Sequence, residues 1–336
     1  MTAPGRVVVR GPNWLGDLVM TAPSVSAIRA HWPQAAIDLA VPAAFASIVP
    51  VLCPGVEALP LEGGRRGLRA LRRHAARIAE GRYDLAVLFT HSFGTALTMR
   101  AAGVPERWGY RRDGRSLLLT RAVRRSRVRR ATPQHADEYA ALVEALGVPR
   151  PVLSVHAEVS PEMRAEAHAV LRAEGWDGAA PLLVCAPGAA YGTAKQWPPE
   201  SVGQVASEWL THGGCVALVG ADADRSAADA VRAATSAPVI DLTGRSSLLM
   251  LAAVLATATR VLANDSGAMH LAAALGTPVV AVFGPTREHV TAPLGPHTIL
   301  THEVWCRPCM LRECPLDHAC MTRVTPARVL AALRDR

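Results

Sequence analysis

Residues 260–284 read RVLANDSGAMHLAAALGTPVVAVFG, and this stretch decides the fold class of the chain. Two short apolar runs, 260–263 and 279–283, flank an alanine-rich segment of helical length. Continuous apolar runs are typical of strands buried on both faces of a parallel sheet, and parallel strands need a crossover connection that is usually a helix. The stretch therefore predicts a strand, a helix and a parallel strand, and with them an α/β fold.

The same alternation continues outward in both directions from this stretch. In the C-terminal half, further strands are predicted at residues 182–186, 216–220 and 239–242, and a last helix at 326–335. Helix starts are indicated by Pro198 and Pro199 and by the N-cap candidates Ser246 and Asp265 or Ser266. In the N-terminal half, strands are predicted at residues 6–10, 36–41 and 85–90, and helices at 17–31, from Ser92 onward and at 137–146.

A chain of 336 residues is longer than one typical domain, so two domains are expected. Residues 147–161 contain three prolines and show no clear period, which favours a boundary there. We predict domains at 1–150 and 151–325 and a C-terminal helix at 326–336. Each domain is predicted to be doubly wound and Rossmann-like, with a central cleft between the two, and ligands bind such sheets outside the carboxyl ends of the strands.

Composition predicts a cytoplasmic protein. Residues 1–10 contain no apolar signal segment, and the longest apolar stretch, 248–258, is too short to cross a bilayer. Seven cysteines, an odd number, argue against an exported disulfide framework.

The net charge of +8 is concentrated between Arg65 and Arg130. This stretch contains eighteen arginines, and its only acidic residues are Glu80, Asp84, Glu106 and Asp113. Such a stretch favours an anionic partner, either a phosphorylated lipid surface or nucleic acid. It has few aromatic residues, no zinc-finger spacing and no RNA-binding signature, so no nucleic-acid partner is predicted. A solvated arginine-rich face with no partner is the alternative interpretation.

Two loops at predicted strand ends carry a single charged residue each. Residues 11–17, GPNWLGD, match neither a dinucleotide fingerprint nor a P-loop, and they deliver Asp17 to a helix start. That residue is either a reactive carboxylate or a helix cap. Residues 187–198, PGAAYGTAKQWP, contain Lys195, the single lysine among 36 basic residues. A compact ammonium suits a phosphate, although one lysine could also survive by accident of composition.

Two further loops are rich in small and acidic residues. Residues 220–224, GADAD, place Asp222 where it could bind ribose hydroxyls, a weak signal because aspartate is common at helix starts. Residues 264–270, NDSGAMH, follow a strand and open a helix, so the N–H groups of Ser266 and Gly267 form a predicted anion site. His270 is predicted one turn further along, where it could equally be a packed core residue.

Together, residues 11–17, 194–198 (AKQWP) and 264–270 resemble, in this order and spacing, the ADP-heptose lipopolysaccharide heptosyltransferases. Within that family, residues 13–17 and the stretch from 91–93 (HSF) through 107–110 (RWGY) are most similar to heptosyltransferase II. The resemblance covers nearly the whole chain. It implies the two-domain GT-B fold, an N-terminal domain that binds the acceptor and a C-terminal domain that binds ADP-heptose.

The resemblance also implies the activity and the site. The reaction would be inverting transfer of L-glycero-D-manno-heptose from ADP-heptose to heptosyl-Kdo2-lipid A, at the inner face of the inner membrane, with peripheral membrane contact. Asp17 would be the catalytic base. The donor-side residues would be Lys195, Asp265, Ser266, Gly267, His270 and Asp222, and the acceptor-side residues Asn13, Trp14, Gly16 and Ser92. No cofactor would be required, no metal is assigned to the site, and a divalent cation would be at most stimulatory.

One feature departs from the best-known members of the subfamily. Four cysteines, Cys306, Cys309, Cys314 and Cys320, form a C-x2-C-x4-C-x5-C cluster. It is consistent with reduced thiols, a local disulfide or a structural zinc ion, and no catalytic role is assigned to it. The alternative functions are heptosyltransferase I or III activity, another GT-B sugar-nucleotide transferase, and a non-catalytic protein that binds acidic lipid or nucleic acid.

Overall fold

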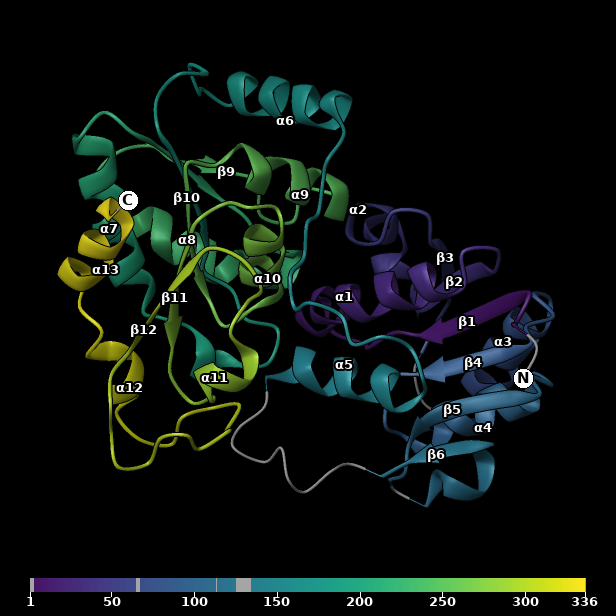
Figure 1. Ribbon diagram of the computed structural model, residues 1–336. Helices are drawn as coiled ribbons and strands as arrows, with labels where there is room; N and C mark the ends of the chain where they lie inside the picture. Colours follow the sequence, from purple (N-terminus) through teal and green to yellow (C-terminus); the bar gives the residue numbers. More distant parts are fainter. Residues whose placement is uncertain (1–2, 65–66, 113, 125–133, 336) are drawn as a thin grey trace. The chain divides into compact units, whose positions relative to one another are not determined.

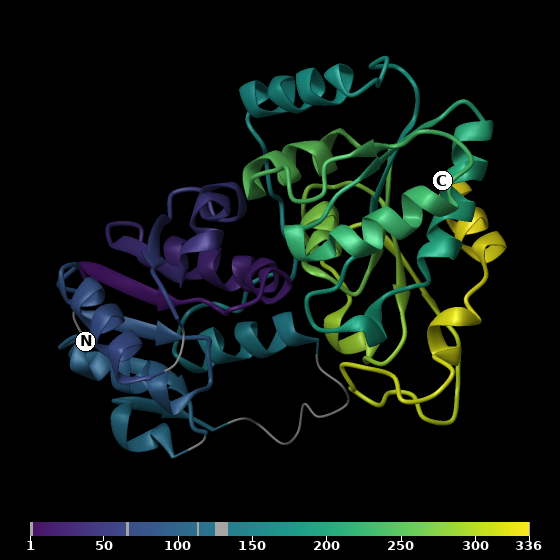
Figure 2. The same cartoon turned by 180° about the vertical axis from the view of Figure 1, so that it is seen from behind.

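The computed structural model describes residues 3–64, 67–112, 114–124 and 134–335, which form two compact units, Met1–Val155 and His156–Arg336 (Figures 1 and 2). The break between the units falls inside the proline-containing stretch 147–161. Each unit has its own sheet of six parallel strands and its own apolar core.

The sheet of unit 1 has the strand order β3-β2-β1-β4-β5-β6. Its strands are β1 (Arg6–Arg10), β2 (Ala36–Pro42), β3 (Glu57–Leu61), β4 (Leu85–Leu88), β5 (Glu106–Tyr110) and β6 (Arg121–Val123). The helices are α1 (Leu15–His31), α2 (Val49–Leu52), α3 (Leu68–Ala79), α4 (Phe93–Ala101) and α5 (His135–Ala145), with 3-10 turns η1 (Ala43–Ile48) and η2 (Arg115–Leu118). Helices α1 and α5 pack side by side (Figure 1).

The sheet of unit 2 has the order β12-β11-β10-β7-β8-β9. Its strands are β7 (Leu182–Ala186), β8 (Cys215–Leu218), β9 (Ile240–Asp241), β10 (Arg260–Asn264), β11 (Val279–Phe283) and β12 (His297–Thr301). The longer helices are α6 (Pro161–Ala173), α7 (Pro199–Thr211), α8 (Arg225–Ala234), α9 (Leu248–Thr257), α10 (Gly267–Ala274) and α13 (Pro326–Arg334). The short ones are η3 (Thr193–Lys195), η4 (Asp222–Asp224), α11 (Glu288–Thr291) and α12 (Ala319–Thr322).

Burial explains why the central strands have continuous apolar sequences. All five residues of β7 and all five of β11 are buried, because helices cover both faces of a parallel sheet. Small residues let those helices approach closely: a Cβ on Gly203 of α7 would lie 2.6 Å from the Cβ of Ala234 at the end of α8. The predicted α/β class, with two doubly wound parallel sheets, is confirmed.

The strand order reverses once in each sheet, between β1 and β4 in unit 1 and between β7 and β10 in unit 2. At such a switch point the connections leave on opposite faces of the sheet, so the loops diverge and leave room for a ligand outside the carboxyl ends. The four loops singled out by sequence follow β1, β7, β8 and β10. Three of these four loops therefore flank a switch point.

Some predicted details were wrong. The N-cap of α9 is Ser247, whose hydroxyl accepts from Met250 N at 3.1 Å, and not Ser246. Helix α1 begins at Leu15 with Trp14 as its N-cap, two residues before the predicted start at Asp17. Four strands were not predicted, namely β3, β5, β6 and β12. Three of these are edge strands, which carry polar residues or are too short to give an apolar run.

Candidate functional site

The loops on either side of the unit 2 switch point are joined by a short ion pair. Lys195, in the loop after β7, donates from Nζ to Oδ2 of Asp265 after β10 at 2.6 Å. Their side chains are 12% and 6% exposed. The ammonium also lies 4.8 Å from the centre of the Tyr191 ring, a cation–π distance. The two residues predicted to bind the donor are thus brought together by the fold.

A third loop completes this group. Thr286 follows β11, and its hydroxyl donates to the same Oδ2 of Asp265 at 2.7 Å. Both hydrogen bonds that we find for this carboxylate within the described part of the chain fall on Oδ2, which leaves Oδ1 for a ligand hydroxyl. A nearly buried carboxylate with two donors holds the ammonium in a fixed position, where it can face a phosphate.

Asn264, the last residue of β10, fastens the Lys195 loop to the sheet. Its Oδ1 accepts from the backbone N–H of Trp197 at 2.9 Å, and its Nδ2 donates to the carbonyl of Pro187 at 2.7 Å. The side chain is 2% exposed. One amide therefore satisfies a buried donor and a buried acceptor at opposite ends of the loop.

The N-terminus of α10 lies directly after Asp265. Ser266 is its N-cap but makes no side-chain capping bond, and within the described residues its buried hydroxyl has no hydrogen-bond partner. Gly267 is the first helical residue, so the free N–H groups of this turn and the positive end of the helix dipole are available to an anion. His270 is 3% exposed on the same helix, as a packed core residue would also be.

The segment 302–318, which contains three of the four clustered cysteines, supports the Lys195 loop from outside. The carbonyl of Arg312 accepts from Ala194 N at 2.9 Å, and Tyr191 donates from its hydroxyl to the carbonyl of Met310 at 2.8 Å. His318 bonds through Nε2 to the carbonyl of Ala194 at 2.7 Å. A Cβ on Gly192 would lie 2.3 Å from the Arg312 carbonyl oxygen, so only glycine allows this contact.

The cysteines themselves are free thiols that line one cavity of about 320 Å³. Burial, and then the neighbouring thiols of Cys314, Cys309 and Cys306, raise the pKa of Cys320. Among the residues that the structure describes, no three His, Cys, Asp or Glu side chains are placed to hold a metal ion. The disulfide alternative is not observed.

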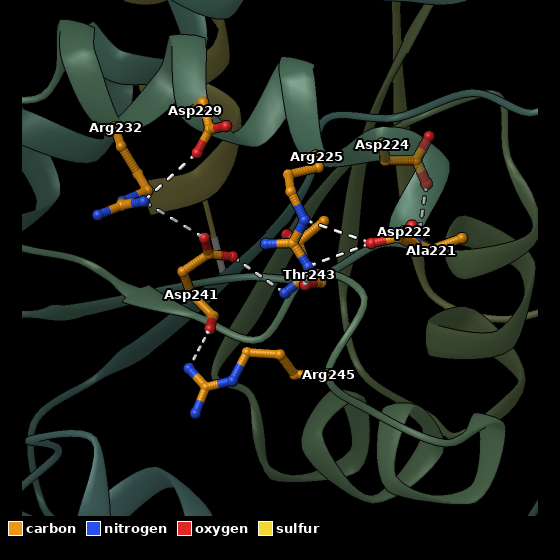
Figure 3. A network of polar contacts seen from close by, with 9 residues as sticks. All are labelled: Ala221, Asp222, Asp224, Arg225, Asp229, Arg232, Asp241, Thr243 and Arg245. Atoms are coloured by element: carbon orange, nitrogen blue, oxygen red, sulfur yellow. Dashed lines mark hydrogen bonds and ion pairs between the residues drawn. The ribbon is translucent and has the colours of Figure 1, made fainter.

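Asp222 belongs to a polar network after β8 (Figure 3). Its carboxylate accepts from Arg225 at 3.3 Å, and Arg225 also donates to the carbonyl of Thr243 at 2.9 Å. Asp222 and Asp224 have the D-x-D spacing of a metal motif, which sequence reasoning missed. Asp224 accepts instead from Ala221 N at 2.9 Å, so the two carboxylates are committed to different partners.

The switch point of unit 1 carries Asp17. It is the third residue of α1, and Trp14 is the N-cap, so Asp17 is not the cap itself. Its Oδ1 lies 3.4 Å from Nδ1 of His135, the first residue of α5. Burial, and then the Asp17 carboxylate, raise the pKa of Tyr139 on α5. Tyr139 is therefore held neutral beside Asp17 and is a poor substitute base.

The other predicted acceptor-side residues surround the same loops. Asn13 accepts from Arg10 at 2.7 Å, and Arg10 also donates to the carbonyl of Ala40 at 3.1 Å, which ties the loop after β1 to β2. Trp14 is 42% exposed, and Gly16 lies in the first turn of α1. Ser92 is the N-cap of α4 and accepts from Thr95 N at 3.2 Å. Ser92 thus has a structural role as the residue that caps α4.

The arginine-rich stretch is structurally mixed. Residues 65–66, 113 and 125–130 of it lie outside the described residues. Arg115 is fully buried and donates to the carbonyls of Tyr110 and Thr90, and Arg107 donates to those of Leu118, Val104 and Pro105. By contrast, α3 exposes four arginines at helical spacing, Arg69, Arg72, Arg73 and Arg77.

Three contributors to the two sites escaped sequence reasoning, namely Asn264, Thr286 and His135. Asn264 was quoted in its loop but given no role, because its two partners are 67 and 77 residues away. Thr286 follows a predicted strand in a Gly-Pro-Thr turn, and that position was the available signal. Only the packing of α5 on α1 brings His135 to Asp17, since 118 residues separate them.

Known proteins resemble this chain over most of its length. Residues 71–320 match glycosyltransferase family 9 (heptosyltransferase). Lipopolysaccharide heptosyltransferase 2 of Salmonella typhimurium is 32% identical over 302 residues, which cover 86% of this chain and 85% of that protein. Lipopolysaccharide heptosyltransferase 1 of Pseudomonas aeruginosa is 30% identical over 358 residues, covering 98% and 97%.

The solved structure of E. coli ADP-heptose LPS heptosyltransferase II has a TM-score of 0.82 to this chain at 28% identity, and the match covers 98% and 97% of the two chains. This likeness confirms the predicted GT-B fold.

Asn264→Ala should lower the free energy of unfolding by about 2 kcal/mol or more, because a buried N–H and a buried carbonyl each lose their partner. Urea unfolding measures the change, with Gln204→Ala, which removes an exposed amide in the same unit, as the control. Equal stability of the two variants would show that the loop does not depend on this amide.

Proposed function

The chain belongs to glycosyltransferase family 9, the heptosyltransferases, and we propose that it transfers a heptose from ADP-heptose to the inner core of lipopolysaccharide, as heptosyltransferase II does. It is therefore a glycosyltransferase, and the alternative of a non-catalytic binding protein is not retained. The proposed acceptor is heptosyl-Kdo2-lipid A.

The observation that carries this proposal is the ion pair at the unit 2 switch point. Lys195, Asp265 and Thr286 converge beside the N-terminus of α10. A fixed ammonium and a helix N-terminus suit the diphosphate of a sugar nucleotide, and a carboxylate oxygen beside them suits a sugar hydroxyl. We assign ADP-heptose to unit 2 on this basis and the acceptor to unit 1.

The proposed reaction is a single inverting displacement. Asp17 accepts the proton of an acceptor hydroxyl while that oxygen attacks the anomeric carbon of the heptose. The bond from the anomeric carbon to the diphosphate oxygen breaks on the opposite face, and its electron pair leaves with ADP. The first turn of α1 suits this task, because it places the carboxylate at the switch point, outside the carboxyl end of β1.

Charge grows on the diphosphate as the bond breaks, so groups aimed at it act more strongly in the transition state than in the ground state. Lys195 and the N–H groups of the turn at Ser266 and Gly267 are the proposed donors. We propose that no cofactor is required, and that a divalent cation is at most stimulatory, because these groups can neutralise the leaving group by themselves. Turnover that persists in a chelator would support this part of the proposal.

Heptosyltransferase I activity is the second candidate, because the Pseudomonas enzyme 1 is 30% identical over nearly the whole chain. The two candidates can be separated by incubating the purified protein with ADP-heptose and with core acceptors that carry either no heptose or one heptose. The mass of the lipid product is then measured. One added heptose on the acceptor that already carries one selects activity II. Addition only to the heptose-free acceptor selects activity I, and no addition to either contradicts the proposal.

Asp17→Asn should lower kcat by about 10²- to 10⁴-fold, because an amide cannot accept the proton. The KM for ADP-heptose should change little, since that ligand is assigned to the other unit. Turnover within a few-fold of wild type would mean that another residue is the base.

Lys195→Ala should lower kcat by about 10²- to 10³-fold, as loss of one transition-state donor does. Lys195→Arg should restore only part of it, because a planar guanidinium does not fit a nearly buried position that is bonded to Asp265 at 2.6 Å. The acceptor KM is the internal control and should stay near wild type. Full activity of the Arg variant would make the solitary lysine an accident of composition.

We further propose that the protein acts at the cytoplasmic face of the inner membrane and binds this membrane peripherally through α3. Arg69, Arg72, Arg73 and Arg77 lie on the exposed side of this helix, opposite the buried Ala70, Ala75 and Ile78. In the described part of the chain, no helix combines the length and apolar character needed to cross a bilayer. Clustered arginines are attracted to anionic headgroups, and salt screens this attraction.

Replacing these four arginines by glutamine should reduce binding to vesicles that contain anionic lipid at low ionic strength. A matched variant that removes four exposed arginines of unit 2, Arg164, Arg323, Arg328 and Arg334, changes the net charge equally. Vesicle co-sedimentation compares the two. Equal losses would assign binding to overall charge and not to α3.

A further inference from the structure

We infer that His135 is a positioning residue for Asp17, donating a hydrogen bond from Nδ1 to Oδ1 of the carboxylate so that Oδ2 faces the acceptor hydroxyl. This inference rests on the proposed function, in which Asp17 is the base. The distance between the two atoms is 3.4 Å, at the long end of the hydrogen-bond range. Such contacts between catalytic groups often shorten when substrate binds.

The two residues are held by rigid elements. Asp17 lies in the first turn of α1 and His135 is the first residue of α5, and these helices pack against each other within unit 1. Behind them, the neighbouring turn of α5 is anchored by Tyr139, whose buried ring lies 5.2 Å from the ring of Phe89. Because the helices fix both backbones, the pair has little freedom to separate, and the carboxylate is oriented before substrate arrives.

Both side chains of the pair are partly exposed, as expected for residues that a substrate must reach. The side chains of His135 and Asp17 are 39% and 27% exposed, so both can be reached by an acceptor. A packed structural histidine would be buried. A partly exposed polar pair of this kind contributes little to stability, so a purely structural role predicts only a small effect of its removal.

Hydrogen-bond chemistry defines the role. With its proton on Nδ1, the neutral ring donates to Oδ1, and a carboxylate that accepts one bond in a fixed direction presents its second oxygen in a fixed direction too. The reaction then proceeds as proposed, with the acceptor proton moving to Oδ2 and the leaving electron pair moving to ADP. His135 itself makes and breaks no covalent bond.

The experiment compares His135→Ala, His135→Asn and His135→Gln in heptose transfer. An asparagine Nδ2 can take the place of Nδ1, whereas a glutamine amide reaches only the position of Nε2. We expect kcat to fall about 10- to 100-fold in the Ala and Gln variants and to recover largely in the Asn variant, with the KM for ADP-heptose unchanged. His212→Ala removes the histidine of another exposed pair, 3.7 Å from Glu208, and should have no effect.

A double variant distinguishes action through Asp17 from any other role. If His135 acts only by orienting this carboxylate, then Asp17→Asn combined with His135→Ala should be no slower than Asp17→Asn alone. Three results would overturn the inference and leave the proposed function intact. The first is a double variant whose loss of kcat equals the product of the two single losses. The others are a kcat of His135→Ala within twofold of wild type, and equal recovery of kcat in the Asn and Gln variants. Failure of the wild-type protein to transfer heptose would overturn both the inference and the proposed function.

Discussion

The constraint on which the structure depends is that all the strands of each sheet are parallel and that their order reverses once. Parallel strands end at the same edge, so residues distant in sequence meet there, and the reversal opens a space between diverging loops. Lys195 and Asp265 meet across the reversal in unit 2 although 70 residues separate them. Asp17 occupies the equivalent position in unit 1. The fold thus decides where chemistry is possible before any side chain is chosen.

Hydrogen bonds to its buried polar groups then decide how firmly the proposed donor site is held. Asp265 is nearly buried, and an unpaired carboxylate there would be destabilising, so Lys195 and Thr286 stabilise the folded state in addition to their proposed part in the reaction. The support extends outward to segment 302–318, where the guanidinium of Arg307, 4% exposed, pairs with Glu288 and Glu303 and donates to the Gly284 carbonyl. The partners of Asn264, Asp265 and Arg307 thus hold these loops in place.

Sequence reasoning predicted the fold class and the loops, because apolar runs and small-residue turns are local signals. It placed Lys195 and Asp265 in one site through resemblance and position, and it quoted Asn264 without a role. It missed Thr286 and His135, whose contributions exist only through partners more than twenty residues away. Strands such as β6 and β12 were also missed, since an edge strand needs little apolar sequence once its neighbour provides the hydrogen bonds. The rest required tertiary contacts that no local pattern encodes.

The arginine-rich composition is explained only in part by an anionic partner. A guanidinium offers five donors in a planar fork, so one side chain can satisfy several carbonyls, as Arg107 does for three. Arg115 does so for two carbonyls while fully buried. These two arginines connect loops, and the buried Arg115 contributes nothing to a charged face. The solitary lysine stands at a position of another kind, where one compact charge meets one carboxylate oxygen of Asp265. The net charge therefore overestimates how much positively charged surface the chain offers to an anionic partner. The exposure of each arginine in its folded unit is the better measure.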